Sequence, residues 1–547
     1  MSGISELLSD LRMYSRFAWG LHGFLRGRIT LPQAEEIVRR RLEEREANFL
    51  RLVERGVYGH PRSPYLPLLK LAGCEPGDLR QMLRDRGLES TLRALREAGV
   101  YVSFEEFKGR EPMVRQGRVL PTRARDFDNP HLSASYQVES GGSTGAGSRV
   151  ELDLEHLAAT ASTRMLCYAA HGLLDTPTAV WGGIPPDSRA LAIILRRARF
   201  DRVPQRWFTP LSTRELHPAL KHRFATQFTI GMSRLMGVPI PSPRPLPLDQ
   251  AHVLARWAAA TIRARGSCLI RSQVSTTLRI CLAARELGLD LRGAAFMGGG
   301  EPPTPAKVRE ITRGGARWIP SYAQVEAGTI GSGCARPLDG NDVHFLEDGL
   351  ALIQHPRQVP GTEIDVTAFH FTTLLPSVPK VMINVETDDY GVLEQRACGC
   401  PFERYGFRQH IREIRSFRKL TGEGVTLIGS DMVRILEEVL PGRFGGSPLD
   451  YQLQEEEDER GFTRLSLIVS PRVPLADEAA LIEVVLAELG RLGGAADSAR
   501  ATWRQSGSLR VKRQEPAWTA RGKLMPLHLI RSERFAATAS DAPRAQG

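Results

Sequence analysis

The sequence predicts an α/β protein that consists of a large domain with a helical N-terminal lobe and a small α+β C-terminal domain. Residues 1–130 have the apolar spacing of helices, and from residue 131 short apolar runs alternate with helical stretches. After about residue 420 a shorter set of helices and strands follows. Strands that alternate with helices are typical of βαβ units, so we expect a mostly parallel sheet in the large domain.

In the helical lobe, the clearest expected helix begins at Leu31 and runs to about Val53. Thr30 precedes it in the position of an N-cap, and charged residues cover the faces away from its apolar stripe. Two shorter helices are expected at 79–86 and 91–98, ended by Gly87 and Gly99.

In the rest of the chain, the apolar pattern predicts further elements in order. Strands are expected at 179–181, 293–297, 363–366 and 381–385, with a helix at 276–287. The C-terminal domain is expected to hold helices at 430–440 and 478–492 and strands at 464–470 and 508–512. The acidic run 455–459 is interpreted as a solvated turn, and residues 533–547 as a disordered tail.

Composition and charge exclude several classes of protein. The 547 residues carry a net charge of +11, but 65 of the 73 basic residues are Arg and acidic residues lie between them, so we expect no nucleic-acid face. No run of about 18 apolar residues is present, so no membrane span is expected. Seven scattered cysteines and an N-terminus without signal-peptide features favour a cytoplasmic protein.

The strongest local motif is the glycine-rich segment Ser140, Gly141, Gly142, Ser143, Thr144 and Gly145, which follows an extended run. Small residues allow close approach of a ligand, and successive N–H groups can then surround a phosphate. The segment is neither a Walker A loop nor a dinucleotide fingerprint. It also matches Gly-x-Ser-x-Gly, in which Ser143 would be a hydrolase nucleophile, and a plain surface loop is the third interpretation.

Further motifs follow in a specific order along the chain. Gly299, Gly300, Glu301 and Pro302 come after an expected strand, and Tyr322 to Glu326 read Tyr-Ala-Gln-Val-Glu. Thr387-Asp388-Asp389 follows another strand, and Lys523 lies in Thr-Ala-Arg-Gly-Lys near the C-terminus. With this order of motifs, the chain resembles the adenylate-forming superfamily over residues 130–528, and within it the phenylacetate–CoA ligase-like branch.

The resemblance implies an acid–thiol ligase that uses ATP and Mg²⁺ to convert a small carboxylic acid to an acyl-adenylate. The acyl group would then pass to CoA or to the phosphopantetheine of a carrier protein. Residues 140–145 would hold the ATP phosphates, residues 299–302 would lie against the adenine, and Tyr322 would stack near it. Glu326 would bind Mg²⁺, Asp389 the ribose hydroxyls, and Lys523 the carboxylate and α-phosphate.

The resemblance also implies a domain arrangement. It divides the chain into a helical lobe (1–130), an ATP- and acyl-binding core (131–414), a hinge (415–422), a mobile C-terminal lid (423–532) and the tail (533–547). The sequence departs from the family where Asp388 replaces a Gly and where the hinge lacks two acidic residues. Arg415 or Arg418 would supply the ribose-contacting Arg, and Lys419 would mark the hinge.

Four residues have the spacing and chemistry of a structural zinc site: Cys334, His344, Cys398 and Cys400. Three thiolates and one imidazole suit tetrahedral zinc, and relatives in the same branch look similar. Unligated cysteines in a reducing compartment are the alternative.

Several alternatives for function stay open from the sequence alone. The activated acyl group could pass to an amine, a hydrazine or a protein acceptor in place of a thiol. A serine hydrolase that uses Ser143 and a nucleotide-binding relative without catalysis are the other two. A homodimer is likewise left open.

Overall fold

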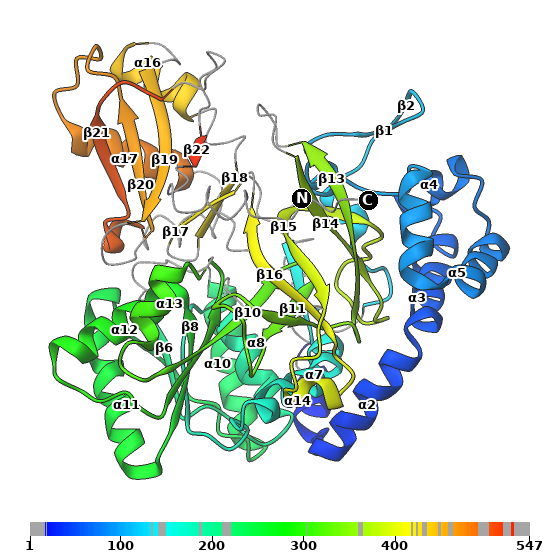
Figure 1. Ribbon diagram of the computed structural model, residues 1–547, viewed down its shortest axis with the longest axis horizontal. Helices are drawn as coiled ribbons and strands as arrows, with labels where there is room; N and C mark the ends of the chain where they lie inside the picture. Colours follow the sequence, from blue (N-terminus) through cyan, green and yellow to red (C-terminus); the bar gives the residue numbers. More distant parts are fainter. Residues whose placement is uncertain are drawn as a thin grey trace, which may run out of the picture.

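The computed structural model of the chain describes residues 17, 19–132, 135–139, 149–184, 189–210, 220–301, 303–358, 365–416, 419–422, 425–428, 435–446, 450–457, 463–490, 503–517 and 527–529. Its largest element is a twelve-stranded sheet flanked by helices, and a separate four-stranded sheet lies above it in Figure 1. The predicted α/β class is confirmed. No helix among the described residues combines the length and apolar character that crossing a membrane needs.

One half of the large sheet is parallel, as the alternating pattern predicts. Its strands, in spatial order, are β10 (Arg317–Gln324), β9 (Ala294–Gly299), β8 (Cys268–Gln273), β5 (Thr178–Trp181), β6 (Arg206–Thr209) and β7 (Pro243–Pro245). Apolar residues of α7 (Leu154–Ala170) and α8 (Arg189–Ala198) cover one face. The other face packs on α11 (Ala251–Arg265), α12 (Val274–Glu286) and α13 (Pro305–Thr312). Helix α10 (Leu220–Leu235) and η3 (Leu248–Gln250) complete this half.

The other half is antiparallel, so the prediction of a mostly parallel sheet is wrong for the six strands after β10. They are β11 (Gly328–Gly333), β12 (Val343–Phe345), β16 (Gln409–Ser416), β15 (Val385–Gln395), β14 (Asp365–Thr373) and β13 (Leu350–Gln358). A short turn joins Gln324 of β10 to Gly328 of β11, which leaves no room for the crossover that a parallel pair needs. The short helix α14 (Pro401–Arg404) precedes β16.

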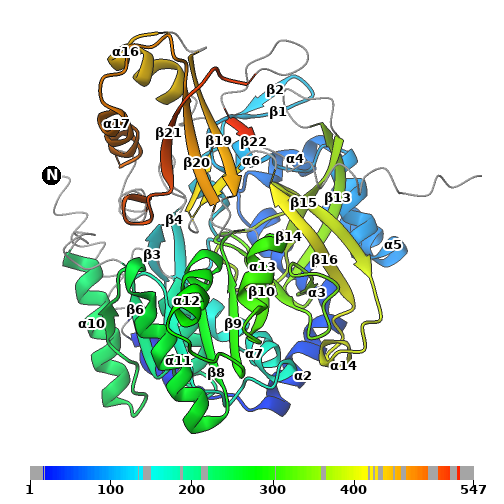
Figure 2. The ribbon, with the colours of Figure 1, turned by 60° about the vertical axis from the view of Figure 1, so that its left-hand side comes forward.

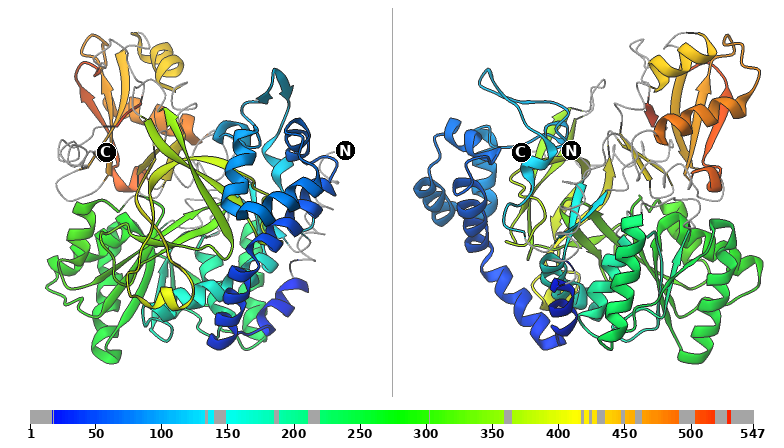
Figure 3. Two further views of the ribbon diagram at one scale, coloured as in Figure 1. Left: turned by 45° about the vertical axis from the view of Figure 1, so that its right-hand side comes forward. Right: turned by 180° about the vertical axis from the view of Figure 1, so that it is seen from behind.

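The helical lobe shares its core with the antiparallel half, and Figure 3 shows its helices beside those strands. Thr30 caps α2 as predicted: its hydroxyl accepts from Gln33 N–H, and the Gln33 side chain accepts from Thr30 N–H. The expected single helix is broken at Glu44, and Gly87, with φ 74°, kinks one long helix where an end was expected. The elements are α2 (Leu31–Glu43), α3 (Arg45–Val53), η1 (Glu54–Tyr58), α4 (Tyr65–Leu71), α5 (Pro76–Glu97), α6 (Phe104–Phe107), β1 (Met113–Arg115), β2 (Arg118–Leu120) and η2 (Ala124–Phe127).

The C-terminal unit has its own core around Tyr451 and Trp503. Its sheet order is β21 (Leu509–Arg513), β20 (Thr463–Val469), β19 (Tyr451–Glu457) and β22 (Leu527–Leu529). Helices η4 (Ile435–Val439), α16 (Leu440–Phe444) and α17 (Glu478–Gly490) pack on this sheet (Figure 2). The acidic run 455–459 was expected to be a solvated turn, but its first three residues belong to β19, which pairs with β20 up to Glu457. Lys512 and Ser466 both donate to Glu456, and residues 458–459 lie outside the described part of the chain.

Two hairpins complete the fold. Strands β17 (Lys419–Gly422) and β18 (Val425–Ile428) pair between the large sheet and the C-terminal unit. Strands β3 (Ser135–Glu139) and β4 (Arg149–Asp153) pair antiparallel just before α7. The glycine-rich segment therefore joins two paired strands, and its own residues lie outside the described part of the chain.

Candidate active site

The second glycine-rich segment lies at the carboxyl end of β9, on the edge of the parallel sheet where α/β proteins commonly bind ligands. Gly299 approaches β10 so closely that a Cβ there would lie 2.0 Å from the carbonyl oxygen of Ser321. Gly300 follows with φ 88°, a conformation that side chains rarely adopt. The chain can therefore make this turn only because both positions are glycine.

Glu301 ties this segment to the start of α12. Its carboxylate is buried and accepts from the N–H of Ser275 at 2.7 Å and from the Ser275 hydroxyl at 2.6 Å. The ammonium of Lys307, equally buried, lies 3.5 Å away. The Glu301 side chain thus holds the loop in place from inside, and Pro302 lies outside the described residues.

Tyr322 and Asp389 come from strands on opposite sides of the junction between the two halves of the sheet. The Tyr322 hydroxyl on β10 donates to Oδ2 of Asp389 on β15 at 2.8 Å, and Gln324 Nε2 donates to the same oxygen at 2.8 Å. Burial and the adjacent carboxylate of Asp389 raise the pKa of Tyr322 well above its usual value, so the hydroxyl stays protonated. Two motifs far apart in the sequence therefore meet beside Gly299.

Arg415 lies on β16 near this pair. It is opposite Tyr390 in the strand register, whereas Asp389 is opposite Ser416. Because neighbouring residues of a strand point to opposite faces, the register places Arg415 and Asp389 on different faces of the sheet. The Ser416 hydroxyl donates to the carbonyl of Asp388 at 3.2 Å, which fastens the end of β16 to β15.

Glu326 lies in the turn after β10, and its carboxylate forms an ion pair with the ammonium of Lys108. Burial raises the pKa of Glu326, but Lys108 outweighs burial and lowers this pKa to about 2. Sequence reasoning missed Lys108, because it lies in the helical lobe, where no chemical motif was recognised. The available signal was composition, since only eight residues of the chain are Lys.

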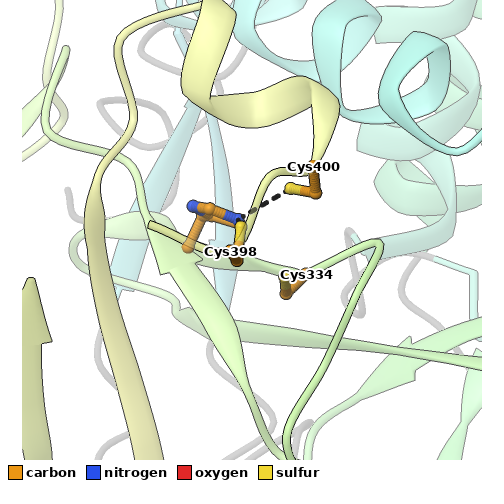
Figure 4. A group of neighbouring side chains, drawn as sticks. Cys334, Cys398 and Cys400 are labelled. Atoms are coloured by element: carbon orange, nitrogen blue, oxygen red, sulfur yellow. Dashed lines mark hydrogen bonds between the residues drawn. The ribbon is translucent and has the colours of Figure 1, made fainter. Parts of the chain in front are cut away.

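The four predicted zinc ligands converge in the structure. Their ligand atoms all lie within 4.8 Å of one another, and Figure 4 shows the three cysteines around one point. His344 Nε2 lies 3.1 Å from Cys400 Sγ and 3.5 Å from Cys398 Sγ. Hydrogen bonds from the Cys334 thiol and His344 lower the pKa of Cys400, so one thiolate is favoured here even without a metal.

The surroundings hold the His344 ring in one orientation. The ring stacks on Phe402, with centroids 4.6 Å apart and planes 18° apart, and Phe402 belongs to α14 directly after Cys400. Tetrahedral Zn–S bonds of about 2.3 Å and Zn–N bonds of about 2.0 Å require sulfur–nitrogen separations close to those seen here. The donor set, its burial and its spacing fit structural zinc.

The remaining predicted site residues, Ser140 to Gly145, Arg418 and Lys523, lie outside the described residues, as does the expected tail 533–547. The elements on either side of the first segment bear on the hydrolase alternative. A nucleophile elbow requires a strand-to-helix turn, whereas residues 140–148 join two antiparallel strands with Glu139 opposite Arg149. The local topology therefore disfavours Ser143 as an elbow nucleophile.

No protein-family model matches the chain, and no curated protein matches its sequence. Among solved structures, the chain is similar to a 2-hydroxyisobutyryl-CoA ligase in complex with 2-HIB-AMP and CoA in the thioesterification state. The identity is 16%, the match covers 92% of each chain, and the TM-score is 0.58. A mutant of an amide bond synthetase from Marinactinospora thermotolerans matches at 12% identity over 96% of this chain and 100% of that one, with a TM-score of 0.40. The chain therefore has the fold of the adenylate-forming enzymes over most of its length.

Proposed function

We propose that the protein activates a carboxylic acid with ATP and then transfers the acyl group to the thiol of CoA or of a carrier-protein phosphopantetheine. The observation that carries this proposal is the Tyr322–Asp389 hydrogen bond beside the Gly299–Gly300 turn. It brings three motifs of the predicted nucleotide site to one edge of the sheet, in a fold shared with a CoA ligase solved with an acyl-AMP and CoA.

In the first step, a carboxylate oxygen of the acid attacks the α-phosphorus of ATP. The new carboxyl–phosphorus bond forms as the bond to pyrophosphate breaks, and the products are acyl-AMP and pyrophosphate. Asp389 would accept from the ribose hydroxyls, and the backbone of residues 299–301 would lie against the adenine. Segment 140–145 would surround the phosphates with N–H donors, and Lys523 would neutralise the carboxylate and α-phosphate as they approach.

Mg²⁺ suits Glu326, because a deprotonated carboxylate is the oxygen ligand that this ion prefers. The low pKa of Glu326 keeps the carboxylate charged across the physiological range. Lys108 already neutralises this carboxylate, so Mg²⁺ binding would require the ammonium to move or to turn to the ATP phosphates. The ammonium of Lys108 and the Mg²⁺ ion are therefore two cations that would both lie near Glu326 in the proposed nucleotide site.

In the second step, the thiol sulfur attacks the acyl carbon and AMP leaves. We retain the prediction that the C-terminal lid (423–532) turns about the hinge (415–422) between the steps. The first two residues of this hinge still belong to β16, which pairs with β15 up to Ser416, and its last four residues form β17.

The experiment is pyrophosphate release from ATP and Mg²⁺ with a panel of aromatic, aliphatic and amino acids. We expect release with one class of acid, lost in Lys523→Ala and Asp389→Asn and retained in Lys512→Ala, a matched Lys variant of the same C-terminal unit. Equal release by Lys523→Ala and the unchanged protein contradicts the proposal. Loss in Ser143→Ala, with hydrolysis of esters and no need for ATP, favours the hydrolase.

The acceptor is identified by adding CoA to the preformed acyl-AMP. Consumption of CoA with release of AMP supports thioester formation. Release of AMP with an amine or hydrazine but not with CoA assigns the acceptor to that class. ATP binding without pyrophosphate release for any acid identifies a non-catalytic relative.

We also propose that Cys334, His344, Cys398 and Cys400 hold one structural zinc ion. The cluster joins the end of β11, strand β12 and the loop before α14, which are distant in sequence. A metal that binds only the folded arrangement stabilises the folded state. The ion has no role in the adenylation chemistry of this proposal.

A further inference from the structure

Four arginines surround one tyrosine in the interior of the large domain. Arg164 comes from α7, Arg196 and Arg197 from α8, and Arg271 from β8, and all act electrostatically on one another or on Tyr168. The Arg197 guanidinium lies 4.6 Å from the centre of the Tyr168 ring. Arg164, Arg197 and Arg271 are 9%, 2% and 7% exposed, so this is not a solvated surface.

The hydrogen-bond partners of these arginines are neutral. Arg164 donates to the hydroxyls of Ser321 at 3.3 Å and Thr329 at 2.7 Å. Arg196 donates to the Thr160 hydroxyl at 2.9 Å, and Arg197 to the carbonyl of Arg202 at 2.7 Å. In the described part of the chain, no Asp or Glu forms an ion pair with any of the four.

The nearby acids are already engaged. Asp175 pairs with Arg202 and is largely exposed. Asp348 is buried but accepts from Thr163 at 2.6 Å and lies 3.5 Å from Arg41. Positive charge is therefore in excess around Tyr168.

Several guanidinium nitrogens are buried and have no partner within the described structure. They are Nη1 of Arg164, Nη1 of Arg197, and both Nε and Nη1 of Arg271. Taking an unpaired cation out of water is costly, and it is compensated best by an anion with matching geometry. The guanidinium fork matches a carboxylate through two parallel hydrogen bonds.

Burial and the repulsion between neighbouring arginines disfavour the protonated form of these side chains. Burial lowers the pKa of Arg196 to about 9 and that of Arg271 to about 10. Burial alone would raise the pKa of Tyr168, but Arg271, Arg197 and Arg164 lower it. The lowered pKa of Tyr168 is the direction expected where the surroundings favour negative charge.

The arginine cluster lies deeper in the large sheet than the candidate nucleotide site at the carboxyl ends of the parallel strands. Arg271 is opposite Met297 in the parallel register, two residues before the Gln273–Gly299 pair. At about 3.3 Å per strand residue, Arg271 lies roughly 7 Å deeper in the sheet than Gly299. Arg164 donates to Ser321, whose carbonyl packs against Gly299 and which immediately precedes Tyr322.

We propose that this arginine cluster binds the second carboxylate of a dicarboxylic acid whose first carboxylate is activated with ATP. The inference rests on the proposed function, because it names the substrate class of that same site. The tail of the acid lies between the arginine cluster and the glycine-rich edge of the sheet. The glycine-rich edge above holds its reacting end, so one molecule spans both.

The test compares pyrophosphate release with straight-chain dicarboxylic acids, the monocarboxylic acids of equal length and the monomethyl esters of the same diacids. A charge-assisted bidentate contact predicts a kcat/KM at least about tenfold higher for the diacid. Arg271→Met is expected to remove this preference, and Arg256→Met, which removes an exposed Arg from α11, to leave it unchanged. A preference for monocarboxylic acids, or an unchanged ratio in Arg271→Met, overturns the inference and leaves adenylation intact.

A second measurement separates a binding role from a structural one. Without ligand, Arg271→Met is expected to have a Tm equal to or above that of the unchanged protein, because a buried unpaired charge is removed. Diacid alone is expected to raise the Tm of the unchanged protein but not that of Arg271→Met. A Tm far below that of Arg256→Met identifies Arg271 as a structural residue and overturns the inference.

The thermal measurement also applies if no acid releases pyrophosphate, which would refute the proposed function. Stabilisation by the diacid, lost in Arg271→Met, then still supports a carboxylate site. Equal stabilisation by inorganic phosphate shows a simple anion site and overturns the assignment to a substrate carboxylate.

Discussion

At the scale of single residues, the ion pair of Lys108 with Glu326 joins the helical lobe to the candidate active site. Both side chains are nearly buried, with 13% and 12% exposed. A buried carboxylate that loses its cation is left uncompensated, which costs far more than losing an exposed pair. One Lys therefore affects both the stability of the chain and the charge at the proposed Mg²⁺ ligand.

Lys108→Met is expected to lower the free energy of unfolding at pH 7 by about 3 kcal/mol. The pKa of Glu326 is lowered from 4.5 to about 2 in the folded state, so its stabilising effect is complete above pH 4.5 and is lost as the pH falls toward 2. The difference in unfolding free energy between the unchanged protein and Lys108→Met should therefore become smaller below pH 4.5. Urea unfolding of both proteins from pH 7 down to below pH 4.5 measures this difference. Lys70→Met, at an exposed site on α4, is the control. A difference in unfolding free energy that stays constant with pH contradicts a stabilising ion pair between Lys108 and Glu326.

The motifs in the sequence single out residue types, and the roles of those residues stay predictions. Tyr322 and Asp389 were singled out separately, and the structure joins them by a hydrogen bond. Lys108 was not found, because no local pattern distinguishes a Lys that will meet an acid more than two hundred residues later. The sequence shows that Glu326 carries a negative charge, but it does not show that Lys108 will contact this residue.

At the scale of elements, the close approach of β9 and β10 positions the glycine-rich turn. Gly299→Ala would put a methyl group 2.0 Å from the Ser321 carbonyl, so the two parallel strands must separate. We expect a loss of about 3 kcal/mol in unfolding free energy and loss of ATP binding. Gly314→Ala is the matched control, because a Cβ there meets nothing within 4 Å. Unimpaired ATP binding in Gly299→Ala would show that this turn does not form the nucleotide site.

The cysteine cluster also acts at this scale, because it clamps β12 to the loop before α14. Purified protein is expected to contain one zinc ion per chain, and Cys400→Ser to lose it along with several degrees of Tm. Cys281→Ser, at a buried cysteine outside the cluster, controls for loss of a thiol. Metal analysis measures the zinc content, and thermal unfolding with and without a chelator measures its effect on Tm. Purified protein that contains no zinc and keeps its Tm in the presence of chelator refutes the zinc site.

At the scale of the whole molecule, the C-terminal unit has a core of its own. All members of that core lie between Ile435 and Leu509, whereas the helical lobe shares a core with the large sheet. Units with separate cores can unfold in separate steps, and the proposed movement of the C-terminal unit as a lid would require such independence.

Calorimetry is expected to show two unfolding transitions, each sensitive to its own core. Trp503→Ala should lower only the transition of the C-terminal unit, and Trp207→Ala only that of the large domain, since each removes a buried ring worth about 3–5 kcal/mol. If both variants shift one common transition, the two cores unfold as a single cooperative unit.

From the order of amino acids alone we could predict the α/β class, the N-cap at Thr30, the order of the motifs and the four members of the cysteine cluster. These features depend on neighbouring residues or on a specific order of residue types, which a chain displays before it folds. Three features became visible only in the folded chain: half of the large sheet is antiparallel, Lys108 contacts Glu326, and four arginines lie around Tyr168 with no ion-paired Asp or Glu among the described residues. Such contacts join segments distant along the chain, and they form only when strand register and helix packing bring those segments together.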